Sequence, residues 1–378
     1  MMGINEIIIY IMVIFMSLGA LDKIIGNKFG LGEKFEEGIM AMGSLAVAMV
    51  GVVSLAPVLA VILKPVVVPV YTALGADPAM FATTLLANDM GGYPLAMELA
   101  QSKEAGLFGG LILGAMMGPT IVFTIPVALG IIKKEDRKFL ATGILAGMIT
   151  IPLGCLAGGL AAGFDISMIL SNLVPIIIVS LLLAFGLWKI PEKMIKGFNV
   201  FGRGVVIVIT IGLAAIIIET LTGIVVIPGM APVSDGIEIV GAIALMLAGA
   251  FPMVHFITKV FKKPLLQLGK LLGMGDVAAA GMVASLANNI PMFGLMKDMD
   301  DRGKIINVAF AVSASFVFGD HLGFTAGVAK EMIFPMVVGK LVAGITAVIL
   351  AIVIANNTFG EKTKTEQQIT HKKEGATA

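Results

Sequence analysis

The sequence has few charged residues. Of its 378 residues, only 13% are Asp, Glu, Lys or Arg, whereas 58% are hydrophobic. A soluble domain usually has about 25% charged residues, which keep its surface wettable. This deficit excludes an ordinary soluble globular protein. The formal net charge of +1 also provides no basic surface of the kind that indicates nucleic-acid binding.

Other features of secreted and catalytic proteins are scarce as well. The single cysteine, Cys155, lies in an apolar run, so the chain has neither a disulfide framework nor a cysteine zinc site. The sequence contains no P-loop, no HExxH, no CxxC and no dinucleotide-binding motif before a soluble helix. It therefore predicts neither an enzyme nor an ATP-driven pump, and it predicts no cofactor and no metal site.

Long apolar runs, in contrast, are abundant. A helix of about 20 apolar residues crosses the hydrocarbon core of a bilayer. The 46 glycines suit helices that pack closely within lipid. We therefore expect an all-α polytopic membrane protein with about nine transmembrane helices. The predicted spans are 4–21, 38–62, 106–132, 139–162, 166–188, 204–222, 238–258, 304–329 and 332–355.

Two further stretches, 78–101 and 276–297, are apolar at both ends and polar in the middle, where they read LANDMGGYP and LANNIP. Cytoplasmic loops hold Lys and Arg in excess. If both stretches dip into the membrane and return, 22 of the 26 Lys and Arg residues fall on one side. If both cross, the split is 15 to 11. The charges thus favour two re-entrant hairpins, an outer N-terminus and a cytoplasmic C-terminus. The outer side then keeps Lys64, Lys103, Lys330 and Lys340.

The two halves of the chain resemble each other at an offset near 200 residues. LAND in the first half aligns with LANN in the second, and Gly118-Pro119-Thr120 aligns with Gly319-Asp320-His321. An odd number of spans between the units predicts an inverted repeat, which is typical of carriers that work by alternating access. The predicted organisation is a first repeat 1–165, a linker helix and loop 166–200, a second repeat 201–356 and a disordered cytoplasmic tail 357–378.

Polar side chains within the apolar segments are the candidate binding residues, because ionisable groups inside a membrane are costly and usually functional. A carboxylate can bind an ammonium group by a charge-assisted hydrogen bond, and an asparagine amide can bind a hydroxyl. A histidine can relay a proton, and a tyrosine ring can face a cation. The predicted substrate-binding residues are Asp89, Asn288, Asn289, Asp320, His321, Asn88, Thr120 and Tyr93.

Structural roles for the same residues remain open. Asp320 and His321 could instead form a buried mutual pair that only holds a helix break in place. The three asparagines would suit caps of the hairpin tips. A threonine such as Thr120 commonly donates a hydrogen bond to a carbonyl of its own helix. A tyrosine such as Tyr93 commonly packs against neighbouring side chains.

Several ungapped strings resemble those of the bacterial ethanolamine-utilisation permeases. They are MGINEII, FEEG with MAMG, DMGG, GAMMGPTIVF, IPEKMI, LANNIPMFG and GDHLGF. The resemblance extends to about residue 350. Asp89, Asn288, Asn289, Asp320 and His321 follow the family's pattern. At position 88 the pattern has Cys, so a shared binding role does not carry over to Asn88.

The resemblance implies a multi-pass carrier that imports ethanolamine across the inner membrane. It also implies membrane lipids as surroundings, no nucleic-acid partner, and a functional link to a cytoplasmic ethanolamine ammonia-lyase in a microcompartment. A carrier for another small amine or polar solute, and a membrane scaffold or sensor that transports nothing, remain open. The sequence also leaves open whether the protein forms a homo-oligomer. It does not distinguish uniport from proton coupling or exchange.

Overall fold

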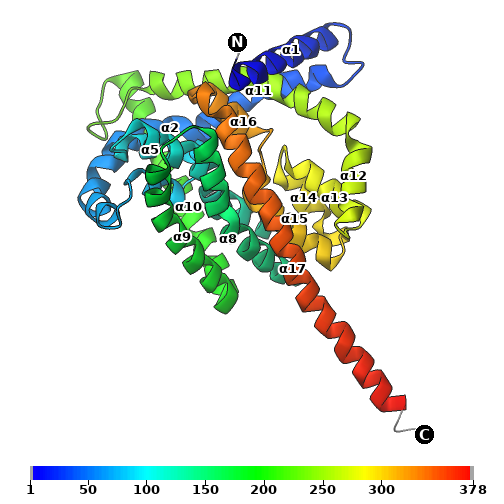
Figure 1. The fold of residues 1–378 in the computed structure, drawn as a ribbon. Coiled ribbons are helices and arrows are strands. Elements are labelled where there is room, and N and C mark those ends of the chain that lie inside the picture. The colour runs from blue at the N-terminus through cyan, green and yellow to red at the C-terminus, as the bar shows by residue number, and fades with distance from the viewer. Residues whose placement is uncertain (1–2, 375–378) are drawn as a thin grey trace.

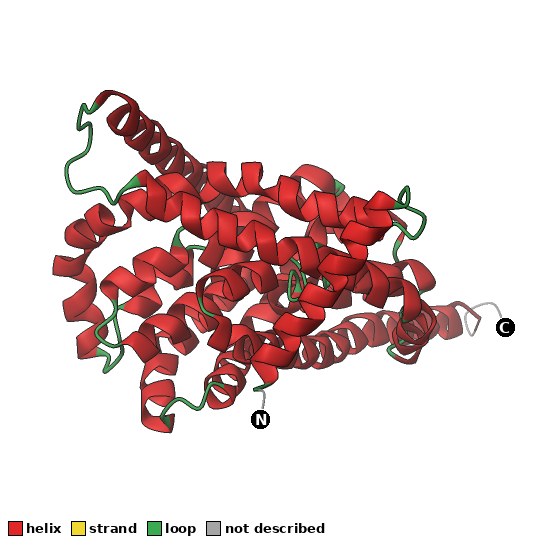
Figure 2. Cartoon of the chain, turned by 90° about the horizontal axis from the view of Figure 1, so that it is seen from above, coloured by secondary structure: helices red, strands yellow, loops and turns green. Residues whose placement is uncertain are grey.

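The computed structural model describes residues 3–374, without the side chains of 262, 265, 268 and 358–374. Within these residues the chain is helical and contains no strand, as Figures 1 and 2 show. The predicted all-α polytopic fold is confirmed, because eight segments of the described chain are long and apolar enough to cross a membrane. They are Ile4–Ile24, Leu31–Ala73, Lys103–Ile131, Lys134–Ala161, Ile166–Lys189, Pro191–Thr222, Val233–Val260 and Lys330–Asn357.

The helices follow one another with short connections. In the first half they are α1 (Ile4–Ile24), α2 (Leu31–Ala73), α3 (Ala79–Leu85), α4 (Gly92–Leu99), α5 (Lys103–Leu107), α6 (Met117–Pro119), α7 (Ile125–Ile131) and α8 (Arg137–Ala161). Next come α9 (Ile166–Lys189) and α10 (Pro191–Thr222). In the second half they are α11 (Val233–Val260), α12 (Lys262–Leu271), α13 (Asp276–Ser285), α14 (Asn289–Leu295), α15 (Asp301–Ala314), α16 (Asp320–Val328) and α17 (Ile333–Glu374).

The long helices form two groups. Helices α1, α2 and α11 pack on one another, and α1 and α11 lie across the upper edge of the molecule in Figure 1. Helix α8 packs against α9, α15 and α17, which run downward in the same view. Gly143 and Gly147 of α8 lie directly against Val308 and Val312 of α15, without room for a Cβ atom. Small residues thus allow the close helix contacts that lipid does not drive by itself.

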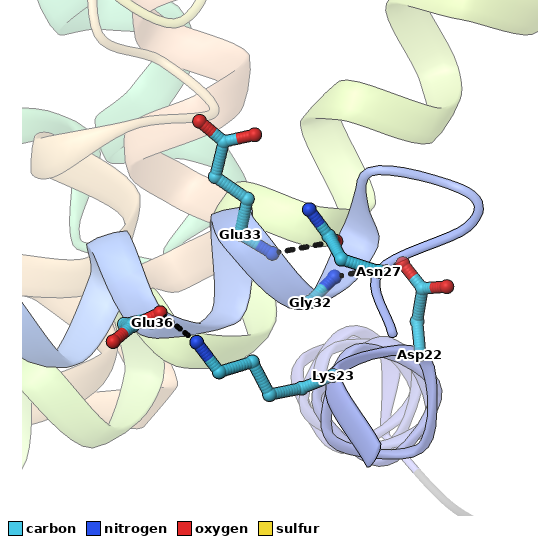
Figure 3. Close-up of polar contacts among 6 residues, drawn as sticks. All are labelled: Asp22, Lys23, Asn27, Gly32, Glu33 and Glu36. Atoms are coloured by element: carbon cyan, nitrogen blue, oxygen red, sulfur yellow. Dashed lines mark hydrogen bonds and ion pairs between the residues drawn. The ribbon is translucent and has the colours of Figure 1, made fainter. Parts of the chain in front are cut away.

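The turn between α1 and α2 is built on one buried carboxylate, Asp22, which is 2% exposed. Its oxygens accept hydrogen bonds from the backbone N–H groups of Phe29, Leu31 and Gly32 at 2.8–3.0 Å. Asn27 accepts a further bond from the N–H of Glu33 at 3.0 Å (Figure 3). The first N–H groups of a helix have no partner within the helix. These side chains supply the missing acceptors for α2.

The predicted single span 304–329 is wrong as one continuous helix. The chain forms α15 and α16 there, and residues 315–319 between them are not helical. Phe316 adopts a left-handed backbone conformation with φ +63°, which a helix cannot contain. The apolar pattern spans both pieces, because hydropathy records burial and does not record where the backbone hydrogen bonds stop.

The sequence predicts a disordered tail from residue 357, and this stays a prediction. The structure continues α17 as far as Glu374. The segment is rich in Glu, Lys and Gln, and these residues have high helix propensity. Residues 375–378 of the predicted tail lie outside the described part of the chain.

Candidate functional site

Both polar stretches form short helical hairpins. The first consists of α3, a 3-10 turn η1 (Asn88–Met90) and α4, and the second consists of α13 and α14. In each pair the two arms pack against each other. The arms have 7 to 10 residues. At 1.5 Å per residue they are about 10–15 Å long, too short to cross a hydrocarbon core of about 30 Å. This geometry favours segments that enter and return, as the charge distribution does.

The tip of the first hairpin is made by residues that leave the helical conformation. Leu86 and Ala87 are extended, and the N–H of Gly92 donates to the carbonyl of Ala87 at 2.8 Å. Gly91 has φ +91°, a conformation that favours glycine. The turn therefore presents Asn88 and Asp89 at the end of the hairpin.

The tip of the second hairpin is capped by an asparagine. Asn288 is extended, and its side-chain oxygen accepts a hydrogen bond from the N–H of Ile290 at 2.8 Å. This is the geometry of an N-cap. The capping role predicted as an alternative for the asparagines therefore describes Asn288.

A discontinuous helix follows each hairpin. Between α5 and α7 the chain passes through two π-helical segments, η2 (Phe108–Ile112) and η4 (Thr120–Thr124), with the 3-10 segment η3 (Leu113–Ala115) between them. Between α15 and α16 the N–H groups of Phe316 and Phe318 donate to carbonyls of the second hairpin, at Ser285 and Leu286, both at 3.1 Å. The second hairpin thus satisfies backbone groups that the second break exposes.

Each discontinuous helix touches the tip of its own hairpin through one glycine. Gly118 lies against the carbonyl of Leu86, and Gly319 lies against the carbonyl of Ala287. In both places the carbonyl occupies the space that a Cβ atom would need. The two contacts are related by a spacing one residue longer than the one that aligns LAND with LANN, so they pair Asn88 with Asn289 and not with Asn288. The inverted repeat itself stays a prediction.

Four ionisable side chains converge near these breaks. Asp89 lies at the tip of the first hairpin, and Lys340 of α17 lies beside the start of α16. Asp320 is the first residue of α16, and the tip segment η1 packs against this helix. His321 is 3% exposed, and its Nδ1 atom lies 3.0 Å from Nζ of Lys340. The structure therefore brings three of the predicted residues, Asp89, Asp320 and His321, into one region.

Lys340 is the ionisable residue that the sequence analysis misplaced. The charge count assigned it to the outer side, but it is 1% exposed and lies within α17 among packed helices. Its ammonium group donates a hydrogen bond to the carbonyl of Ala115. The signal was present, because Lys340 lies within the predicted span 332–355. The charge count did not detect this, because it assigned each Lys and Arg to one side of the membrane and did not consider burial inside a span.

Asn88 and Asn289 are fully buried, and they differ in their partners. Both amide atoms of Asn88 have no hydrogen-bond partner among the described residues. Asn289 donates to the hydroxyl of Thr124 at 3.0 Å, and its side-chain oxygen has no such partner. Buried polar atoms are rarely left without partners. These free atoms are the ones that a polar ligand can bind.

Thr120 and Tyr93 have packing partners. The hydroxyl of Thr120 lies 2.9 Å from the carbonyl of Met116 and 3.1 Å from that of Val312, so it joins the first break to α15. The ring of Tyr93 packs edge-on against Phe324 of α16 with 5.7 Å between centroids. The structural alternatives stated for these two residues match the contacts seen. Their substrate contacts remain predictions.

A basic groove of about 1390 Å³ lies away from these residues, between the start of α8 and the start of α10. None of the predicted binding residues lines it. Its charged lining consists of Lys134, Arg137, Lys138, Lys193, Lys196, Arg203, Glu135 and Glu192. A surface with this excess of positive charge repels a cation. The groove is therefore unsuited to bind an amine.

Together these features define a multi-pass α-helical membrane protein with two hairpins and two discontinuous helices around a cluster of ionisable groups. The chain belongs to the family described as ethanolamine utilisation protein, EutH, which matches residues 4–354. The resemblance noted in the sequence is thereby confirmed.

Named relatives cover nearly the whole chain. A protein of Listeria monocytogenes, named probable ethanolamine permease EutH, is 71% identical over 99% of this chain and 100% of its own length. A protein of the same name in Escherichia coli is 53% identical over 97% of this chain and 99% of its own. The uncharacterised protein YxeR of Bacillus subtilis is 58% identical over 92% and 94%. No solved structure matches the chain.

Proposed function

We propose that this protein is a carrier that imports ethanolamine across the inner membrane into the bacterial cytoplasm. Its relatives in Listeria and Escherichia are named probable ethanolamine permeases. The observation that carries the proposal is that η1 packs against α16, which begins at Asp320 directly after a helix break. Segment η1 contains Asp89 and the buried Asn88, whose amide atoms have no partner among the described residues. Such a site suits a small molecule with one cationic and one polar end.

The chemistry of the substrate matches these groups one by one. Ethanolamine is protonated at neutral pH and carries one ammonium and one hydroxyl group. A carboxylate of Asp89 or Asp320 can accept charge-assisted hydrogen bonds from the ammonium. The amides of Asn88 and Asn289 can donate to and accept from the hydroxyl. The hydrogen bonds that the buried amides lack are thus those that the substrate offers.

The arrangement of the halves supports transport by alternating access. Two units in opposite orientation can exchange inward-facing and outward-facing states of similar energy. Corresponding glycine contacts at the two hairpins support a common design for the units. With the basic loops in the cytoplasm, the N-terminus lies outside and the C-terminus inside.

A carrier matters most in acid surroundings. A primary amine whose pKa lies near that of lysine, about 10, loses roughly tenfold of its neutral, permeant form for each pH unit of acidification. Passive diffusion of ethanolamine therefore falls steeply as the medium becomes acidic. The carrier-dependent share of uptake therefore rises as the medium becomes more acidic.

The test is uptake of labelled ethanolamine by liposomes that contain the purified protein, at pH 5 to 6. We expect saturable uptake that related small amines inhibit and that protein-free liposomes lack. Uptake of another amine but not ethanolamine would assign a different substrate to the same site. If the folded protein transports no amine, the proposal is contradicted. The alternative of a membrane scaffold or sensor would then be favoured.

A further inference from the structure

Lys340 is a buried lysine with two neutral hydrogen-bond acceptors around its ammonium group. It is 1% exposed, and its Nζ atom contacts the carbonyl of Ala115 and lies 3.0 Å from Nδ1 of His321. No carboxylate among the described residues lies within ion-pair distance of it. An ionisable group at such a place in a membrane protein is costly to keep, which points to a function.

The two contacts join the two helix breaks. Ala115 is the last residue of η3, within the first discontinuous helix. His321 is the second residue of α16, directly after the second break. A single side chain from α17 therefore bridges equivalent regions of the two halves. Any change in the charge or position of its ammonium group acts on both breaks at once.

Lys340 also lies near the carboxylates that the proposed function assigns to the substrate. Its contact residue His321 directly follows Asp320 in α16, and the segment η1, which contains Asp89, packs against this helix. In the empty site the ammonium group of Lys340 is thus the positive charge that the ammonium group of a bound amine would replace. Two ammonium groups in one poorly solvated region repel each other strongly.

The other ionisable groups near this part of α17 are few. The elements that pack against α17 or act on Lys340 contribute Glu6 of α1, Asp89 of η1, Asp320 and His321 of α16, and Lys330 and Glu331 of the 3-10 segment η7 (Lys330–Met332). Helix α8 contributes the buried thiol of Cys155, because its neighbour Gly154 packs against Gly339 of α17. The other ionisable groups of α8 and α15 lie toward the far end of α17, where Arg302 contacts Asn356. His321 is the only one of these groups that the structure places in direct contact with Nζ of Lys340.

We propose that Lys340 is a tethered cation that gives up its proton when a cationic amine binds, so that the protein exchanges an amine for a proton. The inference rests on the proposed function. On the side where the protonated amine enters the site, the proton leaves Lys340, crosses to His321 or water, and passes to that solution. After the amine is released on the other side, Lys340 takes up a proton there. One positive charge moves in each direction, and the cycle is electroneutral.

Binding itself offers the first test, and it needs no variant. Calorimetry of ethanolamine binding to the purified protein at one pH, in buffers of different ionisation enthalpy, counts the protons released. We expect roughly one proton for each ethanolamine bound, as linkage requires when a lysine is neutralised. Binding without proton release would overturn the inference and leave the proposed function standing. Absence of any binding or uptake would instead count against the proposed function.

Transport in liposomes offers the second test. With the native protein, ethanolamine uptake should drive protons outward and should not respond to an imposed membrane potential. The K340Q variant should lose the proton movement, and any uptake that remains should become sensitive to the potential. The exposed Lys330 provides the matched control, because K330Q should behave as the native protein. Native uptake that an inside-negative potential accelerates, without proton counterflow, would overturn the inference.

Discussion

Two polar regions of this protein are built on buried side chains, and they differ in whether the hydrogen bonds of those side chains are complete. In the turn between α1 and α2, Asp22 accepts three backbone hydrogen bonds, and Lys23 pairs with Glu36 (Figure 3). Near the hairpin tips, Asn88 has no partner among the described residues for either amide atom. The first region is complete without a ligand and holds two helices together. The second lacks partners that a polar ligand can supply.

Buried lysines show the same difference. Lys304 of α15 lies 2.8 Å from the carboxylate of Asp136, and both side chains are nearly inaccessible to solvent. The pair joins the two halves of the chain and is neutral as a unit. Lys340 has only neutral acceptors around it. The pair at Lys304 is complete without a ligand, whereas Lys340 has no carboxylate partner among the described residues and is the lysine to which we assign the proton exchange.

The largest effect is expected when the negative charge of a proposed amine-binding carboxylate is removed. Asp89→Asn and Asp320→Asn should each weaken ethanolamine binding by at least about 30-fold, because a desolvated charge pair is worth 2 kcal/mol or more. Binding is measured by calorimetry on protein that elutes as a folded species. The exposed Asp276 provides a control, since Asp276→Asn should bind normally. Unchanged affinity in both site variants would show that neither residue holds the amine.

The glycines at the hairpin tips test whether the contact between tip and break is required. Gly118→Ala and Gly319→Ala place a Cβ atom where a carbonyl already lies, which should cost about 1–3 kcal/mol and displace the tip. We expect a lower thermal midpoint and loss of uptake in both. Gly130→Ala and Gly294→Ala are matched controls, because no atom lies within 4 Å of their added Cβ. Normal uptake by both tip variants would argue against a role for these contacts.

Two asparagines of the hairpin tips should respond in opposite ways. Asn88→Ala should weaken binding by about 1 kcal/mol, or roughly fivefold, because one hydrogen bond to the substrate is lost. It should not lower the thermal midpoint, since no protein hydrogen bond is broken. Asn288→Ala removes the cap of α14 and should lower stability by about 1 kcal/mol. Thermal unfolding and calorimetry on both variants separate binding from capping. A loss of stability in Asn88→Ala together with a loss of binding in Asn288→Ala would show that Asn88 is structural and that Asn288 binds the substrate.

The smallest effect on transport is expected from changes in the turn between α1 and α2, where the hydrogen bonds of Asp22 are complete. Asp22→Ala leaves three backbone N–H groups without their acceptor and should lower the thermal midpoint by a few degrees. Ethanolamine affinity of the folded fraction should be unchanged. Glu33→Ala is the control, because only the backbone of this exposed residue takes part in the turn. A selective loss of affinity in Asp22→Ala would connect this turn to the binding site.

The sequence predicted the hairpins well, because their tips contain residues that interrupt helices. The predicted stretches 78–101 and 276–297 contain the helix pairs α3–α4 and α13–α14 almost to the residue. Glycine, proline and asparagine at the tips gave that signal. The break between α15 and α16 was harder to locate, because its residues keep the hydropathy of a continuous span. The actual stopping point depends on bonds to Ser285 and Leu286, which are distant in the chain.

The sequence by itself determined the membrane class, the family, the two hairpins and three of the ionisable residues that converge. These follow from composition, local turn residues and shared strings, which need no knowledge of distant contacts. Only the tertiary structure decided that Lys340 faces His321, that Asn288 caps a helix and that Asn88 lacks a partner. The reason is physical: whether a buried polar atom is satisfied depends on atoms brought close by packing, and hydropathy does not record which atoms those are.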